Sequence, residues 1–526
     1  MMQATGDRPL LLRLLLAVLR VLWTIFVITV PLVGVWIASA LAALEDGPVY
    51  LAVIAGALAF PVLPLLWELV AGRLRARLRE RRRSRSLSAQ RSRGRGRDED
   101  QPPILGVWDR IVLRTLAINL AFVGGVLAMR PAQVFEAVAT RGDWMLDGVD
   151  GPWADRARDG LHQAAEGLEW LHRRTHRNAY EELVDERFTS PPPPPRPTPV
   201  AGADAVESET SSGGGPQPGE DLRLEAFADA VEARRWSHWP QPTEPHPLVL
   251  AMPAEAEASI ASVAAYIVEH EPDPWQRTKA IHDYVATRIA YDHAALDAGP
   301  PFPPQDAQTT FESRRSVCAG YANLFAALVQ ESGGRAVVVV GDARSTLEDQ
   351  MRGPGHAWNA VEVEGEWVLV DTTWDAGYKI DGAFAFVYST DYLFVPAEVM
   401  GLTHMPDDPG WQLRAQPLER GEFLRQPVLN PGFFAEGFDL ISPTRSPIVA
   451  ADGEIEVVIG NRQDKYLMAT LLGDGGSALD CRVEPGREIH VRCPLYAPGS
   501  YTLQLFANDE PYGSFEGVGM LAVSNG

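Results

Sequence analysis

Apolar side chains are concentrated at the start of the chain, in stretches long enough to cross a membrane. Residues 21–44 and 47–67 contain no charged side chain, and a helix of about 20 apolar residues spans the hydrocarbon core of a bilayer. The pair Glu45-Asp46 between them is short and acidic, which predicts a helical hairpin. Because the first stretch exceeds the ~7–15 apolar residues of a secretory signal, we expect retained membrane helices rather than a cleaved signal peptide.

A third apolar stretch, residues 111–129, is interpreted as a further membrane helix, although it contains Arg114 and Asn119. Arg114 lies near its start, where a long side chain can reach the membrane interface. A buried amphipathic helix is the alternative interpretation of this stretch. We therefore predict a membrane domain over residues 1–130, with the lipid bilayer as a partner.

The pattern changes after the membrane domain. Residues 131–189 have apolar positions at helical spacings and predict a juxtamembrane helical segment. Residues 190–221 are rich in Pro, Gly and Ser, which is typical of a linker. From residue 222 the chain is globular, and it ends in a region of short strands at 427–526, which predicts a C-terminal all-β sandwich.

Charge is distributed unevenly and predicts which side of the membrane each part faces. Residues 71–97 contain twelve arginines and one acid, a local charge of +11, which leaves −33 on the rest of the chain because the total is −22. Arginine-rich loops stay in the cytoplasm, so three spans would place everything after about residue 131 outside. The acidic remainder argues against nucleic acid as a partner, since phosphate binding needs clustered Lys and Arg.

One cysteine lies at the start of a predicted helix. Cys318 is followed by apolar residues at helical spacing up to Leu328. A helix N-terminus favours a thiolate, and Arg314 and Arg315 add positive charge nearby. A lone cysteine is more often a small buried apolar residue, so this feature needs a second observation.

A histidine and an aspartate on a predicted hairpin supply that observation. Two strand-like segments flank the pair Glu364-Gly365, which has the length of a two-residue turn. Such a turn pairs Trp358 with Asp371 and makes His356 a diagonal neighbour of Asp371 on the same face, about 7 Å away at the backbone. A bulged turn would shift the pairing by one residue and weaken this geometry.

The three residues Cys318, His356 and Asp371 are candidates for nucleophile, base and orienting carboxylate. In this interpretation the thiolate attacks an acyl carbon, the imidazole moves protons, and the carboxylate fixes the imidazole tautomer and stabilises the imidazolium.

The segments that carry these residues resemble the transglutaminase-like superfamily of papain-related folds and, within it, the kyphoscoliosis-peptidase branch. The resemblance covers about residues 222–426. One departure is Ser316, where the family commonly has glycine. The matching motifs are Val317–Ala322, His356–Asn359 and Asp371–Trp374 for the superfamily, and Tyr392–Phe394, His404–Asp408 and Trp411–Leu413 for the branch.

The resemblance implies an α+β papain/transglutaminase-like catalytic domain and acyl transfer through a cysteine thioester, with no cofactor and no metal expected. We expect a membrane-anchored cysteine peptidase or transglutaminase-like acyltransferase acting on peptide or protein amides, with cell-wall peptide as one candidate substrate. The alternative is a non-catalytic surface scaffold or adhesion protein that uses the fold as a binding module. His404 lies in a family motif without assigned chemistry and is interpreted as structural.

The membrane pattern and the resemblance together predict a multi-pass membrane protein with an extracytoplasmic catalytic domain, periplasmic or at the cell surface. In the C-terminal region, Cys481 and Cys493 flank a Pro-Gly turn. They could face each other as a disulfide in an oxidising compartment or remain two buried free thiols.

Overall fold

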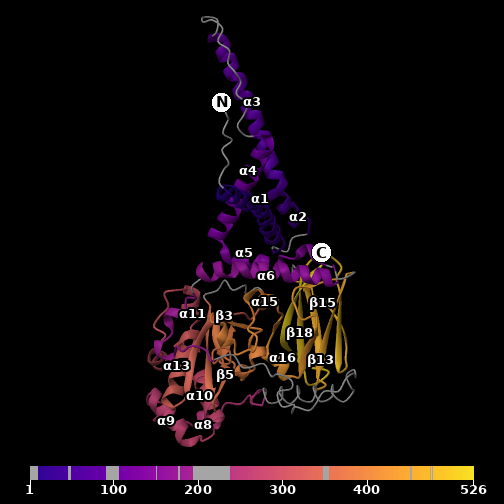
Figure 1. Ribbon diagram of the computed structural model, residues 1–526. Coiled ribbons are helices and arrows are strands. Elements are labelled where there is room, and N and C mark those ends of the chain that lie inside the picture. Colours follow the sequence, from indigo (N-terminus) through magenta and orange to yellow (C-terminus); the bar gives the residue numbers. More distant parts are fainter. Residues whose placement is uncertain are drawn as a thin grey trace, which may run out of the picture. The chain divides into compact units, whose positions relative to one another are not determined.

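The computed structural model (Figure 1) divides the chain into two compact units, residues 1–175 with residue 526, and residues 176–525. Each unit is described by itself. The described residues are 10–44, 49–89, 106–147, 149, 151–175, 178–193, 237–347, 355–450, 453–473, 476 and 478–525.

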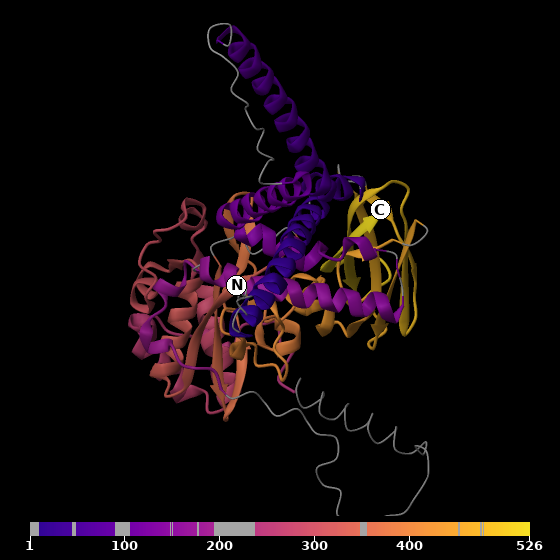
Figure 2. The same ribbon diagram turned by 45° about the horizontal axis from the view of Figure 1, so that its top comes forward.

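The first unit begins with three helices that are long and apolar enough to cross a membrane, over Leu14–Leu44, Tyr50–Leu78 and Val107–Met129. The second of them is assembled from α2, a π-helical turn and α3, and Figure 2 shows α3 as one long helix. The bounds are α1 (Leu10–Leu44), α2 (Val49–Ala57), the π-helical turn (Leu58–Val62), α3 (Leu63–Ala89) and α4 (Val107–Met129).

The arginine-rich segment predicted as a loop over 71–97 is helical up to Ala89, where α3 ends. Arg, Leu and Glu are good helix formers, so charge ends the apolar pattern without ending the helix. Residues 90–97 lie outside the described residues.

Polar side chains on α4 contact α3 and the π-helical turn. Arg114, which the sequence led us to expect at the membrane interface, forms an ion pair with Glu68, and Glu68 also pairs with Arg75 at 2.9 Å. Asn119 donates from Nδ2 to the carbonyl of Ala59 at 3.2 Å. These contacts pair charges and backbone groups that would raise the free energy of the folded state if they were left unpaired in an apolar environment.

The first unit ends with α5 (Pro131–Arg141), a 3-10 turn (Trp144–Leu146) and α6 (Pro152–Thr175). The amphipathic α5 packs against α1, and Trp36 of α1 donates from Nε1 to the carbonyl of Gly142 at 2.8 Å. Helices therefore cover the predicted juxtamembrane segment only up to Thr175.

Residues 178–193 belong to the second unit. They form two 3-10 turns, Glu181–Leu183 and Glu186–Phe188, and they bury Tyr180 and Phe188 in a core shared with Cys318. We call residues 178–189 the strap. The sequence predicts the strap as part of the juxtamembrane helical segment, because its few apolar residues do not reveal what they pack against.

The predicted linker and the start of the predicted catalytic domain are described only in part. Residues 194–221 and 222–236 lie outside the described residues, so these two predicted boundaries stay predictions.

The α+β domain is built on a five-stranded antiparallel sheet in the order β8-β5-β4-β3-β9. Helix α13 contacts β3 and β4, and α9 and α10 pack against α13, as Figure 1 shows. The sheet strands are β3 (Arg335–Ala343), β4 (His356–Val363), β5 (Glu366–Val370), β8 (Leu393–Val395) and β9 (His404–Pro406).

Short strands and helices surround this sheet. The short strands are β1 (Ala290–Tyr291), β2 (Arg315–Ser316), β6 (Gly377–Ile380) and β7 (Ala383–Phe386). The helices are α8 (Pro247–Leu250), α9 (Ile260–His270), α10 (Pro274–Arg288), α11 (His293–Ala298), α12 (Ala307–Ser313), α13 (Cys318–Glu331), α14 (Ala397–Met400), α15 (Arg420–Leu424) and α16 (Pro431–Ala435), with 3-10 turns at Ala256–Ala258 and Pro409–Gln412.

The C-terminal region forms two sheets with a common core, as a β-sandwich requires, and all their strand pairs are antiparallel except β12 with β19. One sheet has the order β10-β19-β18-β14-β15 with β12 beside β19, and the other has the order β11-β13-β17-β16. The strands are β10 (Val428–Leu429), β11 (Phe438–Ser442), β12 (Ile448–Val449), β13 (Glu454–Asn461), β14 (Tyr466–Gly473), β15 (Ala478–Asp480), β16 (Arg482–Glu484), β17 (Glu488–Pro494), β18 (Gly499–Asn508) and β19 (Glu516–Asn525).

A disulfide joins Cys481 and Cys493 across this region. Cys493 lies on β17 and Cys481 directly precedes β16, its antiparallel neighbour. The facing arrangement expected from the sequence is therefore present, and Cys318 is the free cysteine of the chain.

Candidate active site

Cys318 is the first residue of α13, as the sequence predicted. The segment before it is held by Gln305, whose Oε1 accepts from the Ser316 hydroxyl at 2.6 Å and from the Val317 N–H at 3.0 Å. One turn into the helix, Gly320 gives Ser316 room, because a Cβ there would overlap the Ser316 hydroxyl oxygen. Thus Ser316, the departure from the family pattern, helps to fix the backbone of the cysteine.

His356 and Asp371 meet across the hairpin of β4 and β5. Glu364 and Gly365 both have positive φ, 52° and 83°, the backbone of a two-residue type I′ turn. Val363 pairs with Glu366, so the predicted register is confirmed. His356 Nε2 lies 2.6 Å from Asp371 Oδ2, which is the hydrogen bond that this register was expected to allow.

The Cys318 thiol lies close enough to the His356 imidazole for the two groups to interact electrostatically, and this interaction raises the pKa of His356. Since Nε2 of His356 contacts Asp371, Nδ1 is the ring nitrogen left for the sulfur. The structure therefore brings together the three residues that the sequence singled out, and all are buried, with relative exposures of 1% for Cys318, 7% for His356 and 0% for Asp371.

Electrostatics favour an imidazolium–carboxylate pair. Burial lowers the pKa of His356, but the charges of Asp371 and Cys318 outweigh this effect and raise it to about 10. Burial raises the pKa of Asp371, but the charge and hydrogen bond of His356 and a second hydrogen bond from His404 hold it well below its ordinary value. At neutral pH His356 is therefore protonated and Asp371 is ionised.

Asp371 is fixed at both of its oxygens. Oδ1 accepts the backbone N–H groups of Thr373 at 2.8 Å and Trp374 at 3.2 Å. Oδ2 contacts His356 and also His404, whose Nε2 lies at 3.0 Å. The interpretation of His404 as structural missed this contact. His404 reaches the site from β9, which is remote in sequence from Cys318, His356 and Asp371.

Tyr180 of the strap is a second residue that the sequence analysis missed. Its hydroxyl interacts with Cys318 and Tyr291, and burial together with the Cys318 charge raises the pKa of Tyr180. The ring is 1% exposed and stacks on Phe302, with ring centroids 5.2 Å apart. No sequence signal pointed to Tyr180, since it lies far upstream of the family motifs.

Two asparagines hold the strap and α13 in place. Asn323 of α13 donates from Nδ2 to the carbonyl of Leu183 at 2.9 Å and accepts the Asp185 N–H at 3.1 Å. Asn178 donates to the carbonyl of Gly341 on β3 at 2.8 Å. The strap is thereby fixed on both sides of the residue that contacts Cys318.

His356, Asp371 and His404 could in principle hold a metal ion, because their ligand atoms lie within 4.8 Å of one another. Each of these atoms already has a hydrogen-bond partner within the group. An ion would also have to displace the proton of His356, whose pKa is about 10. Hydrogen bonds among the three residues are therefore sufficient to explain why their side chains lie together.

A separate network of buried charges lies behind the site. His282 of α10 contacts Asp283 through Nδ1 at 2.8 Å and Asp375 through Nε2 at 3.0 Å. Asp375 in turn accepts the backbone N–H of Tyr392 at 3.1 Å, and the Tyr392 carbonyl accepts the N–H of Asp371 at 3.0 Å. The network thus ties the loop that carries Asp371 to α10.

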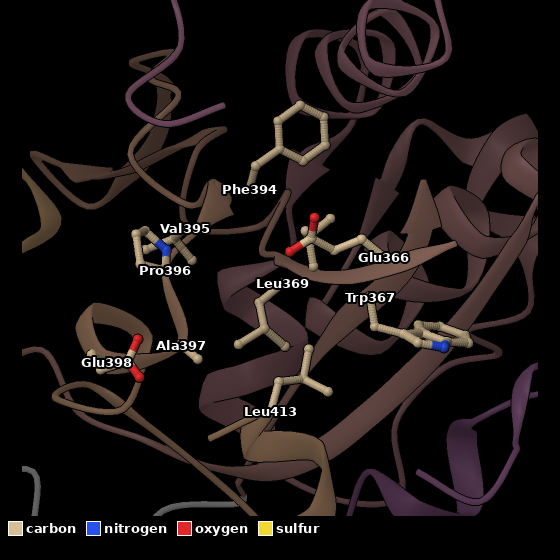
Figure 3. A pocket seen from close by; sticks show the side chains of 10 residues that line it. Glu366, Trp367, Leu369, Phe394, Val395, Pro396, Ala397, Glu398 and Leu413 are labelled. Atoms are coloured by element: carbon tan, nitrogen blue, oxygen red, sulfur yellow. The ribbon is translucent and has the colours of Figure 1, made fainter. Parts of the chain in front are cut away.

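A small pocket of about 40 Å³ is lined by residues of the neighbouring strands β5 and β8 and by the start of α14. Figure 3 shows Leu369, Ala397 and Leu413 beside the carboxylates of Glu366 and Glu398. None of the three candidate catalytic residues lines it. Its volume suits a few water molecules rather than a peptide, so we assign it no role in substrate binding.

Comparison with protein families identifies the two domains. Residues 261–372, which include Cys318, His356 and Asp371, match the family described as "Transglutaminase-like superfamily". Residues 420–520 match "KY-like, immunoglobulin-like domain". The chain therefore contains a transglutaminase-like domain followed by an immunoglobulin-like domain, and the predicted resemblance and fold class are confirmed.

The chain is also similar to curated proteins. It is 27% identical over 276 residues to kyphoscoliosis peptidase of Homo sapiens, covering 51% of this chain and 41% of that protein. It is 29% identical over 249 residues to kyphoscoliosis peptidase of Mus musculus, covering 45% and 37%. The chain thus spans about two fifths of the length of these relatives.

A solved structure described as "Crystal structure of a TGase" is 19% identical and covers 30% of this chain and 40% of its own chain, with a TM-score of 0.19. A similarity of this extent supports no conclusion about the site.

Proposed function

We propose that this protein is a membrane-anchored cysteine acyl-transfer enzyme that acts on peptide or protein amide bonds. The observation that carries the proposal is that Cys318, at the start of α13, interacts with His356, which in turn contacts Asp371. The two similar curated proteins are named peptidases, which supports the same reaction class.

In the proposed reaction the Cys318 thiolate attacks the carbonyl carbon of an amide. The tetrahedral oxyanion is stabilised by the backbone N–H of Cys318, at the positive end of α13. The His356 imidazolium gives its proton to the leaving amine, and a thioester remains on Cys318. Water or an amine then attacks the thioester, with neutral His356 accepting its proton and Asp371 stabilising the imidazolium that forms.

The acceptor of the acyl group decides between hydrolysis, crosslinking and deamidation. We propose peptide or protein amides as the substrate class and wall peptide as one member of it, because the catalytic domain is proposed to lie outside the membrane. That location is supported by the arginine-rich C-terminal half of α3 and the arginines that follow it in the sequence, and by the disulfide Cys481–Cys493, a bond typical of oxidising compartments.

The decisive experiment traps the thioester on the full chain in detergent. Peptide, glutamine and wall-fragment amides are supplied with and without a fluorescent primary amine, and the acyl adduct is located by mass. We expect a hydroxylamine-sensitive adduct on Cys318 in the wild type. Cys318→Ala should abolish it and lower turnover by at least about 10³-fold, while the disulfide and the thermal midpoint are kept. Equal turnover in Cys318→Ala would sink the proposal.

A second candidate function is a non-catalytic binding module. The observation that favours it is the burial of Cys318, which is 1% exposed and in contact with Tyr180 of the strap. This candidate predicts a thiol that iodoacetamide does not alkylate at neutral pH, and partner binding that Cys318→Ala leaves unchanged. Because Cys318 is the free cysteine, one alkylation per unreduced chain distinguishes the two candidates.

A further inference from the structure

Two imidazoles share one oxygen of Asp371. His356 Nε2 lies 2.6 Å and His404 Nε2 lies 3.0 Å from Asp371 Oδ2. An ionised carboxylate only accepts hydrogen bonds. Both Nε2 atoms must therefore carry a proton, which makes His404 a donor to Asp371.

The second ring nitrogen of His404 fixes its tautomer. The groups that face this histidine are Asp371, His356, Tyr392 and Thr403, and Thr403 Oγ1 lies 2.9 Å from His404 Nδ1. Burial lowers the pKa of His404 to about 4, so the ring is neutral at physiological pH. A neutral ring with a proton on Nε2 presents Nδ1 as an acceptor. The single proton of the Thr403 hydroxyl then goes to Nδ1 at 2.9 Å in preference to its other acceptor, the Met400 carbonyl at 3.3 Å.

Packing prevents the His404 ring from turning away. The centroid of His404 lies 4.5 Å from that of Trp374, 5.0 Å from that of Trp358 and 5.3 Å from that of Tyr392. Trp374 and Trp358 also flank His356, at 5.5 and 5.9 Å. The two imidazoles are thus held on one carboxylate by the same aromatic side chains.

We propose that His404 is a positioning residue for acyl transfer: a neutral imidazole that donates through Nε2 to Asp371 and so holds the carboxylate in the orientation that aims His356 at the leaving group. This proposal rests on the proposed function. His404 itself touches neither the thiol nor the substrate, and Thr403 acts one step further back by fixing the His404 tautomer.

A substrate pair separates positioning from mere structural support. The departure of an amine requires the proton of His356, whereas a p-nitrophenolate leaves without one. Misplaced His356 should therefore slow amides and spare activated esters. The probes are the peptide amide that the full chain turns over and the p-nitrophenyl ester of the same acyl group, both measured on the full chain in detergent.

The matched variants are His404→Gln, whose side-chain amide can still donate to Asp371, and His404→Met, which has a similar length and no donor. In His404→Met we expect amide turnover to fall about 100-fold through kcat, which is the scale of positioned proton transfer, with ester acylation changed by less than about threefold. His404→Gln should restore most of the amide turnover. Thr403→Val should show the same selective loss at a smaller size.

Each outcome decides the proposal. Equal losses on ester and amide, or a His404→Gln variant no better than His404→Met, would overturn it. If His404→Met does not fold, as judged by its thermal midpoint, Thr403→Val decides, and an unselective effect there overturns the proposal. A wild-type chain that acylates on the ester and turns over no amide would instead overturn the proposed function, and this inference with it.

Discussion

At the scale of single residues, the site depends on how the backbone around Cys318 is held. Ser316 and Thr310 fill the space over Gly320, and Ser316 also donates to Gln305, which accepts the N–H of Val317. A side chain at position 320 would have to displace this arrangement. The conformation of the helix start is therefore set by small and polar residues next to the cysteine.

We predict that Gly320→Ala destabilises the protein by about 1–3 kcal/mol, the range for a methyl group forced into a packed site. It should also slow Cys318 alkylation, because the Gln305–Val317 contact moves with Ser316. The matched control is Gly432→Ala in α16, where a Cβ has open space. Thermal unfolding and alkylation rates check this, and equal midpoints for the two variants would contradict it.

His282 makes a pH-dependent contribution to stability. Burial lowers the pKa of His282, but Asp283 and Asp375 raise it to about 9. Because an unfolded histidine titrates near 6.5, this stabilisation is fully present below about pH 6.5 and is lost as the pH rises through about 9. The rise in the pKa of His282 from 6.5 to about 9 corresponds to about 3 kcal/mol of folding free energy.

We therefore predict that His282→Gln lowers the thermal midpoint strongly at pH 6 and much less at pH 10. His356, with a pKa of about 10, also makes the protein less stable as the pH rises. Because His356 is present in both the wild type and His282→Gln, the difference between their thermal midpoints reports His282. The control is His490→Gln on the β-sandwich, at a half-exposed histidine beside Glu456. An unchanged difference across this pH range would refute the assignment.

At the scale of elements, the strap and the β4–β5 hairpin decide what reaches Cys318. The hairpin places His356 and Asp371 through its two-residue turn, and the strap places Tyr180 on the cysteine from a part of the chain before the predicted linker. The cover over the thiol is therefore a separate element from the elements that carry the candidate catalytic residues.

We predict that Tyr180→Ala increases alkylation of Cys318 by a bulky maleimide far more than by iodoacetamide. Removal of the ring opens space over a thiol that is 1% exposed. We expect the rate of maleimide alkylation to rise on the order of tenfold, which corresponds to about 1.4 kcal/mol. Tyr180→Phe keeps the stack on Phe302 and serves as the control. If both reagents accelerate equally, the ring does not act as a cover.

At the scale of the whole molecule, three apolar helices precede the transglutaminase-like domain. An odd number of spans would put the two ends of the chain on opposite sides of the membrane. The arginines of α3 predict the N-terminus inside and the catalytic unit outside.

We predict that protease added to intact cells removes an epitope tag at the C-terminus and leaves a tag at the N-terminus, because only the first would be exposed. Detergent permeabilisation, which should make both tags accessible, is the control. Protection of both tags, or digestion of the N-terminal tag alone, would contradict the predicted topology.

The sequence by itself determined the elements whose information is local. Apolar length revealed the three helices that are long enough to cross a membrane, short strand-like segments between turns revealed strands such as β13 and β14, and the pair Glu364-Gly365 set the register that joins His356 to Asp371. The helical spacing after Cys318 placed it at a helix start. In each case the deciding interactions lie within a few residues of one another along the chain.

Only the tertiary structure decided which distant residues complete the site. His404 comes from β9 and Tyr180 from the strap, and neither position has a local pattern that distinguishes a residue of the site from an ordinary buried side chain. Likewise the ion pair of Arg114 with Glu68 joins two helices whose contact the sequence did not indicate. Contacts between segments far apart in sequence follow from how the elements pack, which the periodicity of each segment does not specify.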